Sequence, residues 1–375
     1  MKKLSKKRRE LDVKIGLLHR QGRAKSKRIA DDKKIANGFA VNAWVDRYRQ
    51  EGLNLELSGN RLTIVLPEKL NFNSDLEITA LNINAIRYLT QKRKVSHRAY
   101  RLGSVNFDHL KSISTSASLV LTAELSKWDD VIRNRLTPNI QNWDKDILVH
   151  FYDLGFFDLF KKKPIEIDKF KTDTGHSRRI VKYIKGRCGD DQKTRTLKTN
   201  ITDMIGDQIN KWMFLHGGLS EAIVNVSHHA YPKEYGFSDV EKNWYLTASF
   251  NTSEKELKVV FYDQGIGIPK SLPTSDLWEK TLEYLSIFPF VDRKKDETLL
   301  RAAVELDRTS TKESDRGKGL QDLLEFIRQR KNGRLSILSL KGLFELEVIN
   351  GAESVRTDHF NNPVRGTLII WSVFV

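Results

Sequence analysis

Residues 217–231 read Gly217-Gly-Leu-Ser-Glu221-Ala-Ile-Val-Asn225-Val-Ser-His-His229-Ala-Tyr231. The apolar residues around the acid and the amide predict a helix, and side chains four residues apart on a helix project from the same face. A carboxylate and a carboxamide are unusual partners on a largely apolar helix. We therefore interpret Glu221 and Asn225 as members of one functional site.

A loop with two glycines follows a predicted strand. It reads Asp263-Gln-Gly265-Ile-Gly267-Ile-Pro269, and the apolar run 257–262 before it has the pattern of a buried strand. Glycines allow the backbone to come close to a flat ligand, while a carboxylate accepts a hydrogen bond from the ligand edge. The amino group of a purine would suit Asp263.

A second glycine pair precedes a helical pattern. It reads Asp315-Arg-Gly317-Lys-Gly319-Leu320, and the helical pattern continues from Leu320. Exposed backbone N–H groups and a cation at the start of a helix have the geometry that holds phosphate. This stretch is therefore a candidate phosphate-binding loop.

Together the three stretches resemble the ATPase superfamily that contains gyrase, the Hsp90 chaperones, histidine kinases and MutL proteins (GHKL). Its N box is Glu-x-x-x-Asn, its first glycine box Asp-x-Gly-x-Gly and its second Gly-x-Gly-Leu, and they occur here in that order. Gly366-Thr367 matches a late Gly-Thr pair on a closing strand. The ending His-Ala-Tyr231 is most similar to the bacterial-type branch of anti-sigma-factor serine kinases and related stand-alone ATP-binding proteins. The resemblance covers about residues 195–375.

The resemblance implies a pocket for ATP and Mg²⁺. Asn225 would bind the metal through its side-chain oxygen, and Glu221 would orient or deprotonate the attacking group. Asp263 would accept a hydrogen bond from the adenine amino group, supported by Thr367. The other residues expected to contact the nucleotide are Gly265, Gly267, Lys312, Arg316, Gly317, Lys318, Gly319 and Leu320. The segment between the glycine boxes would form a lid.

The implied activity is that of a Mg²⁺-dependent ATPase that uses hydrolysis or lid closure to regulate a protein partner. Two alternatives stay open: a serine/threonine kinase of the anti-sigma-factor type, and a nucleic-acid-associated, ATP-gated switch. A two-component autokinase is disfavoured because no histidine stands in a His-Glu-x-x-Pro context. The sequence does not decide whether the reaction is hydrolysis or phosphotransfer, or whether the protein forms a homodimer.

Composition and charge set the broad class. The 375 residues include one cysteine, Cys188, and 39% hydrophobic residues, and no run of about 18 apolar residues occurs. Because the start is also too charged for a signal peptide, we expect a cytoplasmic protein without membrane contact. Residues 1–50 hold 16 Lys+Arg and 5 Asp+Glu, a net of +11 out of +16. This basic, helix-compatible arm could bind nucleic acid, although charge runs are more often solvated tails.

Pattern changes along the chain predict an α+β protein in three parts. These are the basic arm 1–50, a small α/β domain 51–160 and a domain 161–375 with helices on one face of a mixed sheet. The resemblance implies that the last is an ATP-binding, two-layer α/β sandwich of the Bergerat type. Alternating leucines predict a hairpin over 53–66, and 103–119 resembles the strand-turn-helix of STAS domains. Because Ser114-Thr-Ser116-Ala117 departs from the Asp-Ser-Ser-Gly of STAS phosphoacceptors, we expect a helix N-cap there.

The remaining element predictions are helices at 78–89, 117–128, 197–214, 277–288 and 298–306, a helix and turn within 138–160, and strands at 100–105, 165–168, 180–184, 244–250, 257–262, 335–340, 344–349 and 368–374.

Overall fold

A computed structural model describes most of the chain. The described residues are 39–91, 99–128, 133, 139–160, 178–187, 190, 192–206, 209–239, 241–274, 278–310 and 319–375. They form two compact units, one within Met1–Val65 and Ala85–Val105 and the other within Leu66–Asn84 and Asn106–Val375. Most of the predicted basic arm and the predicted strand at 165–168 lie outside the described residues.

The first unit contains the predicted hairpin. Its strands are β1 (Leu55–Ser58) and β2 (Arg61–Val65), with β4 (Arg101–Asn106) next to β2. The alternating apolar residues lie opposite one another, because Leu55 pairs with Ile64 and Leu57 with Leu62. Residues 39–50 and α2 (Leu76–Gln91) are helical. The hairpin, helix and strand predicted between 53 and 105 are confirmed.

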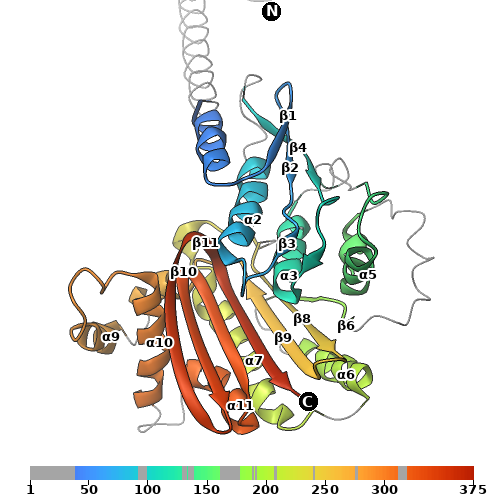
Figure 1. Cartoon of the computed structure of the whole chain (residues 1–375). Helices are drawn as coiled ribbons and strands as arrows, with labels where there is room; N and C mark the ends of the chain where they lie inside the picture. The colour runs from blue at the N-terminus through green and yellow to red at the C-terminus, as the bar shows by residue number, and fades with distance from the viewer. Residues whose placement is uncertain are drawn as a thin grey trace, which may run out of the picture. The chain divides into compact units, whose positions relative to one another are not determined.

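The second unit is built on a six-stranded sheet in the order β10-β11-β9-β8-β6, with β7 also paired to β8 (Figure 1). The strands are β6 (Arg178–Ile180), β7 (Ile184–Arg187), β8 (Asn243–Asn251), β9 (Glu256–Asp263), β10 (Gly333–Ile349) and β11 (Ala352–Phe374). Each of these described pairings is antiparallel. The expectation of a mixed sheet was therefore wrong for this part of the chain.

Strand β10 folds back on itself. Leu340 has a positive φ of 54° at the turn. Beyond the turn, Arg334 Nη2 lies 2.7 Å from Glu347 Oε1, and Ser336 Oγ donates to Glu345 Oε2 at 2.9 Å. The two halves, predicted as separate strands, thus lie side by side, and Figure 1 shows them with β11 at one end of the sheet.

Four helices cover one face of this sheet: α6 (Lys193–Ile205), α7 (Trp212–Asn225), α10 (Asp296–Ser310) and α11 (Gly319–Arg330). Their apolar residues form one core with alternate residues of the strands, for example Leu219 and Leu323 with Phe261 and Trp371. The single helix predicted over 197–214 was wrong. It is divided at Gly206, which takes the left-handed conformation that ends many helices.

Helix α3 (Thr115–Ser126) lies on the opposite face. Thr115 Oγ1 donates to Ser249 Oγ at 2.7 Å, and Ser126 Oγ lies 2.7 Å from Tyr245 Oη. Side chains alternate between the faces of a strand, so these β8 residues face away from the core under α7. Helices α6, α7, α10 and α11 of the predicted domain 161–375 cover one face as expected, whereas the placement of α3 on the other face was not predicted. Ser114 caps α3 as predicted, accepting a hydrogen bond from the Ala117 N–H.

The placement of α3 also bears on the proposed domain bounds. Residues 106–160 belong to the same compact unit as the sheet, whereas the sequence grouped 51–160 together. The described part of the aromatic segment, 139–160, folds as the predicted helix and turn, and Phe151 packs against Phe107 and Trp143. Among the described residues no helix is long and apolar enough to cross a membrane.

The remaining elements are short or lie at the edges. They are β3 (Lys69–Leu70), β5 (Ser112–Ile113), α5 (Lys145–Leu154), η1 (Phe156–Leu159), η3 (Val226–Ala230), η4 (Lys233–Tyr235), α8 (Ile268–Ser271), η5 (Leu272–Thr274) and α9 (Trp278–Leu285).

Candidate functional site

The acid and amide of the N box meet on α7. Asn225 Nδ2 donates a hydrogen bond to Glu221 Oε1 at 2.8 Å, and both side chains are half-buried. The prediction that they share one helical face is confirmed. The helix continues from Asn225 into η3, one turn of π-helix, a distortion found often at functional sites.

Asp263 ends β9 in a buried position. Its side chain is 4% exposed, and Oδ1 accepts a hydrogen bond from the Gly265 N–H at 2.7 Å. Thr367 pairs with Asp263 across the β9–β11 ladder. Burial raises the pKa of Asp263 to about 6, although hydrogen bonds from Gly265 and Thr367 counteract part of that rise. The carboxyl is therefore held in an environment that disfavours its charge.

The glycines of the first glycine box allow close packing against the end of η3. A Cβ atom on Gly265 would lie 2.3 Å from the Ala230 carbonyl oxygen, which already accepts a hydrogen bond from Ile266 N at 2.9 Å. Gly267 has a φ of +87°, which residues with a side chain rarely adopt. The loop after Asp263 is thus bound directly to the segment that continues from the N box.

Sequence reasoning missed Ser339, which ties this loop to two strands. Its hydroxyl accepts a hydrogen bond from Ile268 N at 3.0 Å and donates to the Gly366 carbonyl at 2.9 Å. It also lies 3.4 Å from Thr367 Oγ1. The register of β10 against β11 places Ser339 opposite Thr367, so the signal was present only once that register was known.

Tyr231 holds the loop from the helical side. Its hydroxyl donates to the Asn243 carbonyl at 2.6 Å and accepts a hydrogen bond from Gln264 N at 3.1 Å. Burial, together with the nearby negative charge of Asp263, raises the pKa of Tyr231 well above its ordinary value. The tyrosine was noticed as the end of the N-box motif, but its bond to the glycine loop was not predicted.

Part of the second glycine box can be placed. Lys312, Arg316, Gly317 and Lys318 lie outside the described residues, whereas Gly319 begins α11 and Leu320 packs against the core. Helices α7 and α11 touch at Gly218, where an added Cβ atom would lie 3.1 Å from the Asp322 carbonyl oxygen. The first turn of α11 therefore lies beside α7, about one turn before Glu221.

The described members of the three motifs thus lie on or beside α7 and its continuation η3.

The side-chain oxygens of Glu221 and Asn225 on α7 are suitable ligands for a cation that also binds phosphate oxygens. Within the described ranges no three His, Cys, Asp or Glu side chains group together as a metal cage. Mg²⁺ is commonly bound by one or two protein oxygens plus phosphate oxygens, so it needs no such group. Because Asn225 uses its amide nitrogen toward Glu221, its side-chain oxygen stays free to bind a cation.

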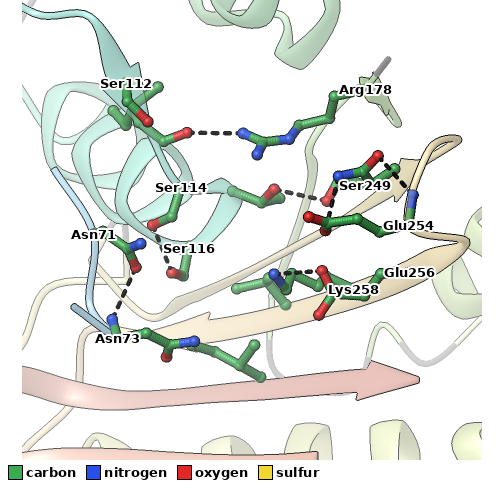
Figure 2. A pocket seen from close by; sticks show the side chains of 15 residues that line it. Asn71, Asn73, Ser112, Ser114, Ser116, Arg178, Ser249, Glu254, Glu256 and Lys258 are labelled. Carbon is green, nitrogen blue, oxygen red and sulfur yellow. Dashed lines mark hydrogen bonds and ion pairs between the residues drawn. The ribbon is translucent and has the colours of Figure 1, made fainter. Parts of the chain in front are cut away.

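A separate polar cavity of about 100 Å³ lies on the α3 face of the sheet (Figure 2). Polar and charged side chains from several elements line it: Asn71, Asn73, Ser112, Ser114, Ser116, Arg178, Ser249, Glu254, Glu256 and Lys258. Many of them bond one another, as Thr115 does with Ser249 and Lys258 with Glu256. We interpret this cavity as the polar seam that attaches α3 to the sheet.

No protein-family model matches the chain, and no curated protein matches its sequence.

Proposed function

We propose that this protein binds ATP with Mg²⁺ beside α7 in a Bergerat-type fold and is an ATPase related to the GHKL superfamily. The buried carboxyl of Asp263 supports this proposal most directly. It lies at the end of a central strand, beside a glycine loop that is bound to the helix of Glu221 and Asn225. Burial there disfavours the charge of the carboxylate, and a ligand that donates a hydrogen bond to it would offset part of that cost.

The chemistry of Asp263 favours adenine. Its pKa is raised by burial, so its ionised form gains from a ligand N–H group that replaces lost water. The adenine amino group is such a donor, whereas guanine presents a carbonyl oxygen at the corresponding position. We therefore expect ATP to bind more tightly than GTP.

The α7 side chains would act at the phosphate end. Mg²⁺, when bound, would neutralise phosphate charge, and Asn225 would hold it through its side-chain oxygen. Glu221 is within hydrogen-bonding reach of Asn225, so it lies near the same end of the nucleotide. There it would orient the attacking water, or accept its proton, as a general base.

The segment between the glycine boxes provides candidate elements for a lid, but α10 is attached to the sheet. Asp296 Oδ2 accepts a hydrogen bond from Lys341 N at 3.0 Å, and Glu297 pairs with His359 at 2.8 Å. If the lid moves when nucleotide binds, the moving part would therefore be another part of this segment. ATP hydrolysis or lid closure would regulate a protein partner through such a movement.

The deciding experiment is turnover of labelled ATP by the pure protein, with the product identified. Free phosphate released only with Mg²⁺ would support the ATPase. A labelled protein product would instead favour the kinase alternative, and tight ATP binding without turnover would favour an ATP-gated switch. Calorimetry that detects no ATP binding, with or without Mg²⁺, would refute the pocket itself.

A further inference from the structure

A wide groove between α6 and α7 carries cations and an aromatic ring. It has a volume of about 520 Å³ and is lined by Arg195, Lys198, Thr199, Trp212, Met213 and His216. None of these residues is acidic. The groove therefore offers a positive, partly apolar surface.

The cations of the groove lie on one face of α6. Arg195 and Lys198 are three residues apart, a spacing that makes side chains neighbours on a helix, and both are exposed. Within the part of the chain that the structure describes, neither forms an ion pair with a carboxylate. Lys198 Nζ instead lies 5.8 Å from the centre of the Trp212 ring. Both charges remain available to an anion.

The aromatic side of the groove comes from the start of α7. Trp212 is half-buried, with part of its surface packed against the core, and its ring centre lies 6.3 Å from that of His216. Met213 beside it is 72% exposed. A tryptophan anchored on one side and open on the other is a rigid platform on which a planar group can stack.

We propose that this groove binds single-stranded nucleic acid. Unpaired bases stack on aromatic side chains, while lysine and arginine bind the phosphates that join them. An enclosed pocket suits a small molecule, but this groove is open to solvent, which leaves room for a polymer.

The groove is separate from the proposed ATP site. Trp212 precedes Glu221 by nine residues, about 13 Å along α7. Nucleic-acid binding here does not depend on the proposed ATPase activity. Saturating ATP and Mg²⁺ should therefore leave the bound strand in place.

The test is fluorescence anisotropy of the full-length chain with labelled oligo(dT) and oligo(rU) of about 12 nucleotides, over a salt series. Trp212→Ala should weaken binding about 5- to 100-fold, whereas Trp212→Phe, which keeps a ring, should bind nearly as the parent does. Lys198→Gln should reduce the slope of log affinity against log salt by about 0.7, the value for one phosphate contact on a single strand. Lys255→Gln removes an exposed charge from the β8–β9 turn and is the matched control, expected to leave the slope unchanged.

Several results would overturn the proposal. The first is a Trp212→Ala variant that unfolds at the parental temperature and still binds the oligonucleotide with the parental affinity. The second is an equal change in the slope of log affinity against log salt for Lys198→Gln and Lys255→Gln. Displacement of the strand by ATP would place binding in the nucleotide pocket instead. Tighter binding of a duplex than of either single strand would exclude base stacking in the groove. Because Lys198 is exposed, its variant should fold even if Trp212→Ala does not.

Discussion

Replacing Asp263 by asparagine should stabilise the fold at neutral pH while removing ATP binding. Burial raises the pKa of this carboxyl from an ordinary value of 3.8 to about 6. At about 1.4 kcal/mol per pKa unit, keeping it ionised in the folded protein costs about 3 kcal/mol. An asparagine oxygen can still accept the Gly265 N–H, so the variant should recover much of that free energy.

The pH dependence gives this prediction its sign. A raised folded-state pKa contributes stability at low pH that is lost as the pH rises from about 4 to about 6. The free energy of unfolding of Asp263→Asn should therefore match that of the parent near pH 4 and exceed it above pH 6. Urea unfolding across this range measures the difference. Asp358→Asn is the control, because Arg356 lowers the pKa of Asp358 and its replacement should not stabilise at neutral pH.

The same carboxyl would link pH to the proposed ATP binding. An adenine amino group favours the ionised form, so ATP affinity in the parent should rise as the pH increases through about 6. Asp263→Asn should bind ATP weakly at every pH in calorimetry. A variant that is destabilised equally from pH 4 to pH 8, or that binds ATP as the parent does, would refute the argument.

Glu221→Ala should keep ATP affinity and lose about 10²- to 10⁴-fold in turnover, whereas Asn225→Ala should weaken Mg²⁺-dependent binding itself; phosphate release and calorimetry separate the two. Gly366→Ala should unfold at a lower temperature, because the new Cβ would lie 2.0 Å from a carbonyl oxygen of the neighbouring strand. His150→Gln should flatten the loss of stability below pH 6.5, since burial lowers the pKa of His150 to about 3 and its protonation opposes folding. Deletion of 1–34 should remove a salt-sensitive part of nucleic-acid binding without changing ATP affinity; equal affinity with and without these residues would leave them a solvated tail.

The sequence predicted best what depends on neighbours along the chain. The hairpin formed because alternating apolar residues at 53–66, all buried except Leu57, share one face, and the Glu221–Asn225 pair required only helical spacing. Asp263 was found for a similar reason, since an apolar run ends at it. Each signal spans fewer than about fifteen residues, within which periodicity is informative.

What the sequence missed depends on contacts between distant segments. Ser339 contacts the glycine loop only because of the register between β10 and β11. Helix α3 has its position only because other elements pack on two of its sides. Residues 115–125 of α3 are all buried, a pattern that indicates a helix enclosed by two layers. The sheet covers one side, and on another His150 Nε2 lies 2.8 Å from Ser118 Oγ. The apolar pattern contained this information, but it did not identify the covering layers.

The groove between α6 and α7 illustrates how one wrong boundary can hide a site. A continuous helix over 197–214 would place Lys198 and Trp212 about 21 Å apart along its axis. Helix α6 instead ends at Gly206, and Lys198 Nζ lies 5.8 Å from the centre of the Trp212 ring. The end of α6 at a left-handed glycine thus allows the cations of α6 to lie beside the aromatic ring at the start of α7. Since α7 carries Trp212 as well as Glu221 and Asn225, the spacing between the proposed nucleic-acid groove and the proposed ATP site is set by this one helix.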